Sequence, residues 1–600
     1  MTLGNAAKFN GPSLAAAAVG PAFLIDSTAA AVAGANATSA ALCFAKSDNG
    51  GVAVLDPAKV AGKIVVCDRG VNARTNKSLA VAEAGGIGMI LVNTSLNSQN
   101  ADLHFVPTVH LSHLDRPAIK AYAATPGATA TIAKATITYS DPAPFTAAFS
   151  SRGPLRAGGG DLLKPDTIAP GQDILAAVAP PGNQGRDFSI YSGTSMSAPH
   201  ISGIAALLKQ LHRDWSPMMI KSAIMTTGYD VLDGPGTDST VIFRQGAGHV
   251  APTAAADPGL VYDSDINDWL AFLCGATNGV QPSVCASLAA AGYSFDTSDL
   301  NLASIAIGDL AGVQTVHRTV TNVGKHTETY TASVTPMPGY TVTVNPASLT
   351  IKARRSKAFT VTFTRTTAPL GTYSGGQLTW TDGEHKVRSP LVVRSVALSA
   401  PVQVSGNGAP LAYQVKFGYD GPFSATARGL VPATLTNRTV SDDPTDSFNP
   451  AGPGVTAIPV TIPAGTTYAR FSLFDANVSP ASDLDLYVFR GATLVGASGG
   501  GTAAEEVNLL NPIAGNYVVY VHGFAVGAPG TANFTLFHWL LAATAAGNMT
   551  VSAPATATLG ATGTINLTFT GLAPGTKYLG SVAYSGMTGL PNPTIVRIDP

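Results

Sequence analysis

The pattern of apolar and polar positions first becomes informative between residues 60 and 95. Two short apolar runs, 63–67 and 89–92, flank a stretch with helical spacing at 76–84. Runs this short, rich in β-branched residues, are typical of buried strands. The pattern therefore predicts a strand–helix–strand unit within the Ala-rich region 21–140.

A glycine cluster, GGIG at residues 85–88, follows the helical stretch of this unit. A dinucleotide-binding loop lies instead between a strand and the N-terminus of the helix that meets the phosphates. The glycines are interpreted as a helix C-cap and turn, and nucleotide binding is not expected.

Two helices with well-marked ends are predicted farther along the chain. Residues 195–211 carry apolar side chains at helical spacing and no charge before Lys209, which predicts a helix buried nearly all round. A second helix begins at the N-cap Ser216, is followed by proline, and stops at Gly228. The next stretch, 229–295, shows no clear period and is expected to be irregular.

Beyond residue 300 apolar and polar positions alternate and are interrupted by turn residues. Strands of this length and spacing are typical of a β-sandwich. Seven are predicted in the first part, at 314–322, 329–334, 341–345, 349–351, 358–364, 376–381 and 390–396. A second β region, at 401–539, alternates as a jelly-roll or sandwich sheet does, and a small β segment occupies 549–600. The clearest strands of the second region are 469–474, 483–488 and 516–521.

Composition excludes several classes of partner. Charged residues make up 12% of the chain, against roughly 25% in average globular proteins. The 35 basic and 36 acidic residues give a net charge of −1, so no basic stripe is available for nucleic acid. No apolar run of 18 residues could span a membrane. Frequent glycine and proline, 63 and 41 residues, favour strands joined by turns.

The four cysteines, Cys43, Cys67, Cys274 and Cys285, form no C-x-x-C pair, which argues against a zinc ribbon. They are expected as two disulfides or as four buried thiols, with Cys274 and Cys285 in a short loop that they could close. Sparse cysteine and little surface charge fit an exported bacterial protein. Residues 1–14 have no signal-peptide pattern, so either the chain is cytosolic or its true beginning lies upstream.

The stretch with the clearest chemistry reads SGTSMSAPH at residues 192–200. A serine in the first turn of a buried helix has its hydroxyl at the positive end of the helix dipole, and its backbone N–H is free to stabilise an oxyanion. Such a position suits a nucleophile. An N-cap serine that only begins a helix explains the same pattern, so the physical argument alone leaves both interpretations open.

This stretch resembles the nucleophile motif of the subtilisin-like serine proteases, and further motifs support the resemblance because they occur in the family's order. They read FSSRGP (149–154), KPDTIAPG (164–171), WSP (215–217), IKSA (220–223), GAGHV (246–250) and DPGLVY (257–262). The last two resemble the large branch of the family best known from plants. The resemblance implies a serine endopeptidase that acts on extracellular polypeptides through an acyl-enzyme on Ser195.

The resemblance also implies a multidomain architecture. It consists of a partial α/β subtilisin-like doubly wound parallel sheet, an inserted protease-associated α+β domain, and all-β sandwich domains. The implied boundaries are the C-terminal part of the catalytic domain at 1–20 and 141–299, the protease-associated domain at 21–140, a fibronectin-III-like sandwich at 300–398, a pre-peptidase C-terminal-like domain at 400–545 and a small β segment at 546–600.

The family's catalytic residues come in the order Asp, His, oxyanion Asn and Ser. Residues 1–194 contain neither an Asp-Thr-Gly or Asp-Ser-Gly element nor His-Gly-Thr-His. None of the histidines has the glycine-rich context of the family's base. They are His104, His110, His113, His200, His212, His249, His317, His326, His385, His522 and His538.

His200 is expected to pack structurally, as in the family, and the histidines at 104–113 are expected to be structural or solvated. The chain as given is therefore expected to be inactive. Its serine helix is expected to expose an apolar patch, because part of the sheet that would cover it is absent. TLGN at 2–5 resembles the family's sequence just after the oxyanion segment. We hypothesise that the sequence is the C-terminal part of a longer secreted protease, with Met1 read from a GTG codon.

Two functions stay open at this point: a serine endopeptidase by family, or a non-catalytic secreted or surface protein whose domains bind partners. No cofactor is expected. Asp483 and Asp485 alternate along one strand and could bind structural calcium. Calcium takes six to eight oxygen ligands, so a solvated sheet edge is the simpler interpretation and no metal site is predicted. The sequence determines neither cleavage specificity nor oligomeric state.

Overall fold

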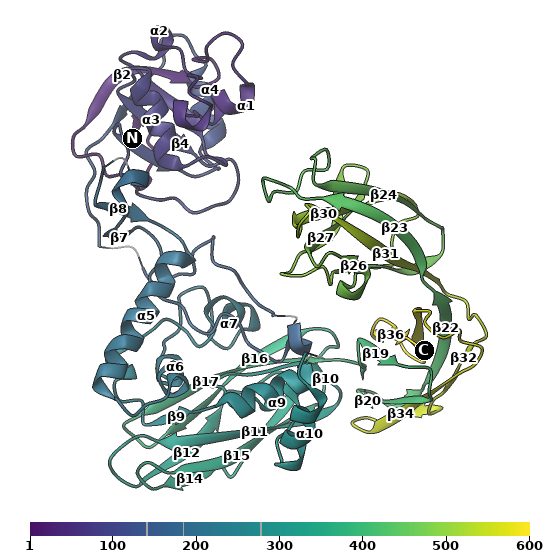
Figure 1. Cartoon of the computed structure of the whole chain (residues 1–600). Coiled ribbons are helices and arrows are strands. Elements are labelled where there is room, and N and C mark those ends of the chain that lie inside the picture. Colours follow the sequence, from purple (N-terminus) through teal and green to yellow (C-terminus); the bar gives the residue numbers. More distant parts are fainter. Residues whose placement is uncertain (140–141, 156, 184, 277–278) are drawn as a thin grey trace.

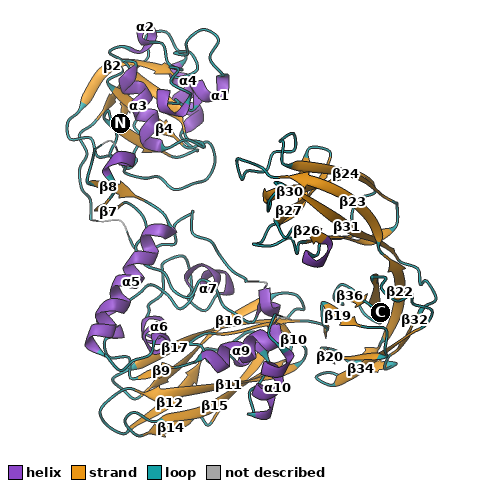
Figure 2. Ribbon diagram, viewed as in Figure 1, coloured by secondary structure: helices purple, strands orange, loops and turns teal. Residues whose placement is uncertain are grey.

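The computed structural model describes residues 1–139, 142–155, 157–183, 185–276 and 279–600. The chain runs from an N-terminal domain of helices and strands, through a mainly helical segment, into β-sandwiches (Figure 1). Figure 2 shows that helices lie mainly in the N-terminal domain and the helical segment, whereas the sandwiches consist of strands. The predicted boundary at 140/141 lies outside the described residues.

The N-terminal domain, residues 1–139, is built on one sheet with the strand order β1-β6-β2-β3-β4-β5. Strands β2 to β5 run parallel, and β6 pairs antiparallel with β1 and β2. The strands are β1 (Thr2–Leu3), β2 (Val19–Asp26), β3 (Ile64–Asp68), β4 (Gly88–Val92), β5 (Thr108–Leu111) and β6 (Thr129–Ile132). The helices are α1 (Ala37–Ala41), α2 (Pro57–Val60), α3 (Arg74–Glu83) and α4 (Arg116–Ala123).

The predicted strand–helix–strand unit is confirmed as β3, α3 and β4. Gly85 follows α3 with a φ of +76°, as expected of a glycine where a helix ends. The side chains of β3 alternate between two cores: Ile64 and Val66 face one, and Val65 and Cys67 face the other. The disulfide Cys43–Cys67 closes the second core.

Residues 1–20 belong to this N-terminal domain, so their predicted place in the catalytic domain is wrong. β1 pairs with β6, and Leu3 is buried in the same cluster as Leu24 and Ile132. The physical reason is that the outer edge of β6 offers backbone groups for pairing, with apolar residues beside them that Leu3 can contact.

The helical segment, residues 142–291, contains one hairpin and a series of helices. The hairpin consists of β7 (Ile174–Ala177) and β8 (Phe188–Tyr191). The helices are α5 (Thr194–Leu211), α6 (Pro217–Thr226), α7 (Ser239–Gln245), α8 (Pro252–Ala255), α9 (Ile266–Ala276) and α10 (Pro282–Ala290). The predicted N-cap of α6 is confirmed, since Ser216 Oγ accepts from the N–H of Met219 at 3.0 Å.

The partial doubly wound parallel sheet predicted for 141–299 is not formed by the described residues. β7 and β8 are antiparallel, and parallel pairing is limited to an isolated bridge between Ile168 and His249. A parallel sheet needs several strands joined by crossovers, and this segment supplies helices and loops instead. The parallel strands β2 to β5 lie in the N-terminal domain.

The expectation of irregular structure at 229–295 is also wrong. Helices α7 and α8 are short, and a short helix gives too few turns for a periodic signal. Length does not explain the other two, because α9 and α10 are about as long as α3 and α6. The disulfide Cys274–Cys285 joins α9 to α10 and does not close a loop as predicted.

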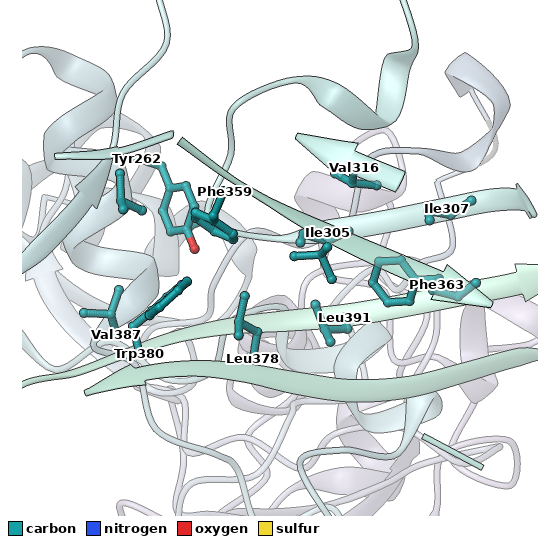
Figure 3. Close-up of a cluster of buried hydrophobic side chains, with 14 of the residues drawn as sticks. Tyr262, Ile305, Ile307, Val316, Phe359, Phe363, Leu378, Trp380, Val387 and Leu391 are labelled. Carbon is teal, nitrogen blue, oxygen red and sulfur yellow. The ribbon is translucent and has the colours of Figure 1, made fainter. Parts of the chain in front are cut away.

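The first sandwich consists of two sheets with the orders β10-β17-β16-β12-β14 and β13-β15-β11-β9. All seven predicted strands are confirmed, as β11 (Val313–Asn322), β12 (Glu328–Val334), β13 (Tyr340–Asn345), β14 (Ser348–Ile351), β15 (Ser356–Arg365), β16 (Tyr373–Thr381) and β17 (Lys386–Ser395). Two strands were not predicted, β9 (Leu260–Tyr262) and β10 (Ile305–Leu310). β9 comes from the helical segment, and its Tyr262 lies in the sandwich core with Phe359 and Trp380 (Figure 3).

Two further sandwiches replace the predicted domains at 400–545 and 546–600. Residues 398–432 and 549–598 together form the split sandwich, and residues 434–542 form the inserted sandwich between its halves. The split sandwich comprises β18 (Leu398–Ser399), β19 (Gln403–Gly406), β20 (Leu411–Phe417), β21 (Gly421–Pro422), β22 (Ser424–Pro432), β32 (Met549–Ser552), β33 (Thr556–Ala557), β34 (Thr562–Phe569), β35 (Tyr578–Ser585) and β36 (Thr594–Ile598).

The inserted sandwich comprises β23 (Thr434–Ser441), β24 (Val455–Ile462), β25 (Thr466–Ser472), β26 (Val478–Ser479), β27 (Asp483–Arg490), β28 (Thr493–Ser498), β29 (Glu506–Leu510), β30 (Gly515–Ala525) and β31 (Thr531–Ala542). The predicted boundaries failed because β18–β22 and β32–β36 are distant in sequence and pair only in space: β34, for example, lies between β20 and β32. A strand pattern does not reveal its partner.

Arg318 fastens the loop between the helical segment and the first sandwich. Its buried guanidinium donates to the carbonyl oxygens of Ser298 at 2.8 Å, Ser304 at 3.1 Å and Leu302 at 3.1 Å. Burial lowers the pKa of Arg318 to about 10, so the side chain keeps its charge at neutral pH.

Replacing Arg318 with leucine is expected to lower the free energy of unfolding by about 4 kcal/mol, because four carbonyl groups, that of His317 included, lose their donor at roughly 1 kcal/mol each. Urea unfolding measures the loss. The control is Arg354→Leu, whose ion pair with Asp214 is exposed and for which a change of at most about 0.5 kcal/mol is expected. Equal losses for the two variants would contradict the assigned role.

Candidate functional site

The chain passes from strand to helix at residues 192–195, here called the serine turn. β8 ends at Tyr191, Gly193 is the N-cap residue and α5 begins at Thr194, so Ser195 is the second residue of the helix. Its N–H is one of the first four of the helix, which have no intrahelical acceptor. Ser195 is exposed. Its hydroxyl therefore lies in solvent at the positive end of the helix dipole.

The loop that ends at Gly171 holds the serine turn. Gly193 N–H donates to Gly171 O at 2.8 Å, and Ser197 Oγ donates to Ala169 O at 2.8 Å. A Cβ at Gly171 would lie 2.9 Å from Gly193 O, which is too close for any other residue without a shift. The glycine in the APG sequence thus lets two distant motifs meet.

A cleft of about 1020 Å³ opens beside the start of α5. Its walls come from the motifs at 149–151 and 164–171, from one side of α5 and from α6. Asp166 lies in one wall and pairs with Lys221 of α6 at 3.1 Å. The motifs that the sequence singled out separately are therefore assembled around a single hollow, and Thr194 and Ser197 line it next to Ser195.

The histidines near this cleft are engaged elsewhere. His200 Nδ1 donates to Met196 O, within its own helix, at 2.8 Å. His249 lines the cleft, and its Nδ1 donates to Val250 O at 3.1 Å. Among the described residues no side chain hydrogen-bonds to the hydroxyl of Ser195. In the described part of the chain, the arrangement thus offers an exposed hydroxyl and a helix-start N–H, with no histidine hydrogen-bonded to that hydroxyl.

His104 and His110, which the sequence placed in a loop cluster, are buried in the N-terminal domain. His104 Nδ1 lies 3.0 Å from Ser78 Oγ, and His110 Nε2 lies 2.8 Å from Asn93 Oδ1. Burial lowers the pKa of each to about 4. Both are neutral structural residues at pH 7.

α5 is not buried nearly all round. Leu208 is 3% exposed and packs against Trp215 and Ile220, whereas Leu207 is 65% exposed and Leu211 is also in solvent. One face of the helix packs on α6, and the opposite face has nothing against it among the described residues. The expected apolar patch is therefore present.

Asp483 and Asp485 are not on a solvated sheet edge. β27, which carries them, is an inner strand of the sheet β24-β30-β27-β28, and Asp485 Oδ2 lies 3.2 Å from Nδ1 of the buried His522. The other nitrogen of this ring lies 3.0 Å from Asp443 Oδ2. Within the described residues no group of three or more acidic, histidine or cysteine side chains is arranged to hold a metal ion.

Sequence reasoning missed Asn100 and Asp173, which contact the serine turn from two sides. Asn100 Nδ2 donates to Ser192 Oγ at 2.7 Å, and Ser192 Oγ donates to Asp173 Oδ1 at 3.0 Å. Asn100 precedes Ser192 by 92 residues. No motif or spacing joins them, so the fold alone reveals the contact.

Comparisons with known proteins give a consistent result. Residues 26–248 match the model of the subtilase family, and residues 299–393 match a fibronectin type-III domain. Subtilisin-like protease SBT1.7 of Arabidopsis thaliana is 42% identical over 420 residues, which cover 65% of this chain and 54% of that protein. Subtilisin-like protease SBT5.3 of the same plant is 40% identical over 423 residues, 66% of this chain and 53% of that one.

Among solved structures, tripeptidyl peptidase 2 aligns with 68% of this chain and 46% of its own at 9% identity, with a TM-score of 0.22. The chain spans about half the length of the curated relatives it matches. None of the described helices is long and apolar enough to cross a membrane.

The exposed face of α5 gives a first prediction. Leu207→Gln is expected to change the free energy of unfolding by at most about 0.5 kcal/mol and to weaken the binding of an apolar dye, because it removes surface that water already contacts. The matched variant of the neighbouring buried residue, Leu208→Ala, is expected to cost 2 to about 5 kcal/mol. Urea unfolding and dye fluorescence measure both. Equal destabilisation by the two variants would show that the face is covered.

The two buried histidines give a second. The pKa of His104 and of His110 is about 4 in the folded state, against about 6.5 when unfolded. Between pH 6.5 and 4 only the unfolded chain takes up these protons. The two neutral histidines therefore contribute fully to the free energy of unfolding above pH 6.5, and this contribution falls as the pH drops toward 4. Urea unfolding should show that the free energy of unfolding decreases between pH 7.5 and pH 5. This decrease should be smaller in a His104→Gln, His110→Gln double variant. An unchanged slope in that variant would contradict the assignment.

Proposed function

We propose that Ser195 is the nucleophile of a serine endopeptidase. The proposal is supported by the match of residues 26–248 to the subtilase family, which the fibronectin type-III domain at 299–393 accompanies. The observation that carries this proposal is the place of Ser195, exposed at the start of α5 beside the cleft. Its hydroxyl would attack the peptide carbonyl and form an acyl-enzyme, which water then hydrolyses. The backbone N–H of Ser195 would be one of the oxyanion donors.

The hydroxyl needs a base to take its proton, and no described residue serves as one. His200 and His249 donate Nδ1 to backbone oxygens, and neither hydrogen-bonds Ser195. In subtilisin itself, loss of the triad histidine alone lowers turnover by about 10⁶-fold. We therefore expect residues 1–600 by themselves to be inactive. Proteolysis would require a segment with the family's Asp, His and oxyanion Asn.

The exposed face of α5 and the cleft mark where such a segment would pack. Leu207 and Leu211 are exposed large apolar side chains of this helix, and an apolar helix face in water favours a partner that buries it. On a helix of 3.6 residues per turn, Leu207 and Leu211 lie on a different side of α5 from Ser195, so the segment would contact the helix on more than one side. Polypeptides are the proposed substrates.

The remaining domains fit an extracellular setting. The disulfides Cys43–Cys67 and Cys274–Cys285 form and persist in oxidising compartments.

The N-terminal domain would correspond to the family's protease-associated domain, inserted ahead of the serine.

An alternative is a non-catalytic binding protein that retains the serine turn as a remnant. The hydroxyl of Ser195, which has no hydrogen-bond partner among the described residues, favours it. The two functions differ in whether Ser195 becomes reactive when a base is provided.

The proposal is tested by fusing a subtilase segment with Asp-Thr-Gly, His-Gly-Thr-His and the oxyanion Asn to the N-terminus of this chain. The fusion is expected to hydrolyse an unstructured polypeptide, and residues 1–600 alone are not. Ser195→Ala in the fusion should abolish turnover, while the control Ser283→Ala, at an exposed position of α10, should leave it unchanged. Hydrolysis that persists in the Ser195→Ala fusion, or a correctly folded fusion without hydrolysis, would favour the binding protein.

A further inference from the structure

The loop between β4 and β5 of the N-terminal domain extends onto the serine turn, where β7 and β8 lie beside that domain (Figure 1). Asn100 of this loop is 1% exposed. Its Nδ2 donates to Ser192 Oγ at 2.7 Å and lies 3.4 Å from Asp173 Oδ1, to which the N–H of Ala101 also donates at 3.2 Å. One side chain from the N-terminal domain thus contacts both ends of the hairpin.

Asp173 and Ser192 close the base of this hairpin. Ser192 Oγ donates to Asp173 Oδ1 at 3.0 Å and accepts from the N–H of Asp173 at 2.8 Å. With the bond from Asn100, the hydroxyl uses its one proton and both lone pairs. Asp173 has a φ of +54°, in the left-handed region that non-glycine residues seldom adopt. These bonds hold that backbone in place, and Ser195 follows Ser192 by three residues.

Asn100 is itself held by the sheet of its own domain. The N–H of Asn100 donates to His110 Nδ1 at 3.0 Å, so the ring proton must be on Nε2, which donates to Asn93 Oδ1 at 2.8 Å. His110 belongs to β5, and Asn93 directly follows β4. Both are buried. A continuous chain of hydrogen bonds therefore runs from the parallel sheet to the serine turn.

We propose that Asn100 is a positioning residue for the nucleophile: the N-terminal domain fixes the serine turn through Asn100, and His110 and Asn93 fix Asn100. This inference rests on the proposed function only in its catalytic consequence. The mechanical part, that the loop holds the turn, stands on the hydrogen bonds alone.

Gln172, next to Asp173, also contacts this loop, since its Nε2 donates to Gln99 O at 3.0 Å, and further contacts of the loop lie away from the turn. Arg186 donates to Leu103 O at 3.0 Å and covers the ring of Phe105 with its guanidinium 5.1 Å from the centroid. These contacts keep the domain docked when Asn100 is changed. The effect of Asn100 is therefore expected at the serine turn and not throughout the hairpin.

The first test is hydrogen exchange of the full chain, read from peptides that cover 171–195. Asn100→Ala is expected to speed exchange at the serine turn about tenfold. Ser95→Ala, at an exposed position of the same loop, is the control in place of Asn97→Ala, because the side chain of Asn97 contacts Ser98, whose hydroxyl donates to Asn100 Oδ1. Equal exchange in Asn100→Ala and the unaltered chain would overturn the proposal.

A charge exchange separates this contact from a general loss of stability. Asn100→Asp places a second carboxylate beside Asp173 and is expected to speed exchange at the turn at least as much as Asn100→Ala. Adding Asp173→Asn removes the repulsion and restores a donor–acceptor pair, so the double variant is expected to return to within about threefold of the original rate. A double variant as fast as the single one would contradict a direct contact.

The catalytic consequence is measured in the fusion that carries the Asp and His segment. Asn100→Ala is expected to lower kcat about tenfold with KM little changed, because a displaced nucleophile affects the reaction step more than substrate binding. An unchanged kcat together with faster exchange would limit the proposal to a structural contact and refute the positioning role. An inactive parent fusion would refute the proposed function, and the exchange data would still decide whether the loop holds the turn.

Discussion

An α-helix leaves its first N–H groups without acceptors, and the site depends on where α5 places them. These groups keep one direction only if the first turn is held from outside, because a frayed end would scatter them. The carbonyls of Gly171 and Ala169 hold it from the loop that precedes the hairpin, and Asn100 holds it from the N-terminal domain. The turn is thus fixed by contacts from two separate parts of the chain.

The helical segment is joined to the first sandwich by a shared strand and a shared core. β9 pairs with β11, and the hydroxyl of Tyr262 lies 2.9 Å from Ser389 Oγ inside the sandwich. Met225 of α6 belongs to the same buried cluster. α5 differs because one side packs on α6 while its other side faces water. The segment therefore has a firm base in the sandwich and an open surface beside the cleft.

The sequence predicted best what depends on local pattern. The unit β3–α3–β4, the N-cap at Ser216 and the seven strands of the first sandwich follow from spacing and turn residues alone. Pairing between distant strands, such as β34 with β20 and β32, does not follow, because alternation indicates a strand without indicating its partner. The burial of α5 was predicted wrongly for a related reason: an apolar pattern shows what a helix could bury, and only the neighbours that are present decide what it does bury. Ser195 was found through a motif, whereas Asn100 and Asp173 have no motif, and the Asn–Asp–Ser contact exists only once three segments are folded together.

The serine turn is fixed while one face of α5 is open, and both features would affect how a segment with the family's Asp, His and oxyanion Asn binds. Ordering a turn on association costs conformational entropy for every residue that becomes fixed. Here Asp173, Ser192 and Gly193 are already hydrogen-bonded, so the cost would fall on the incoming segment alone. The apolar surface of Leu207 and Leu211 would supply a driving force that does not depend on orientation, and the serine turn would supply the directional contacts. Affinity and alignment would thus come from different sides of the same helix, which lets the alignment of Ser195 be adjusted from the N-terminal domain without weakening the association.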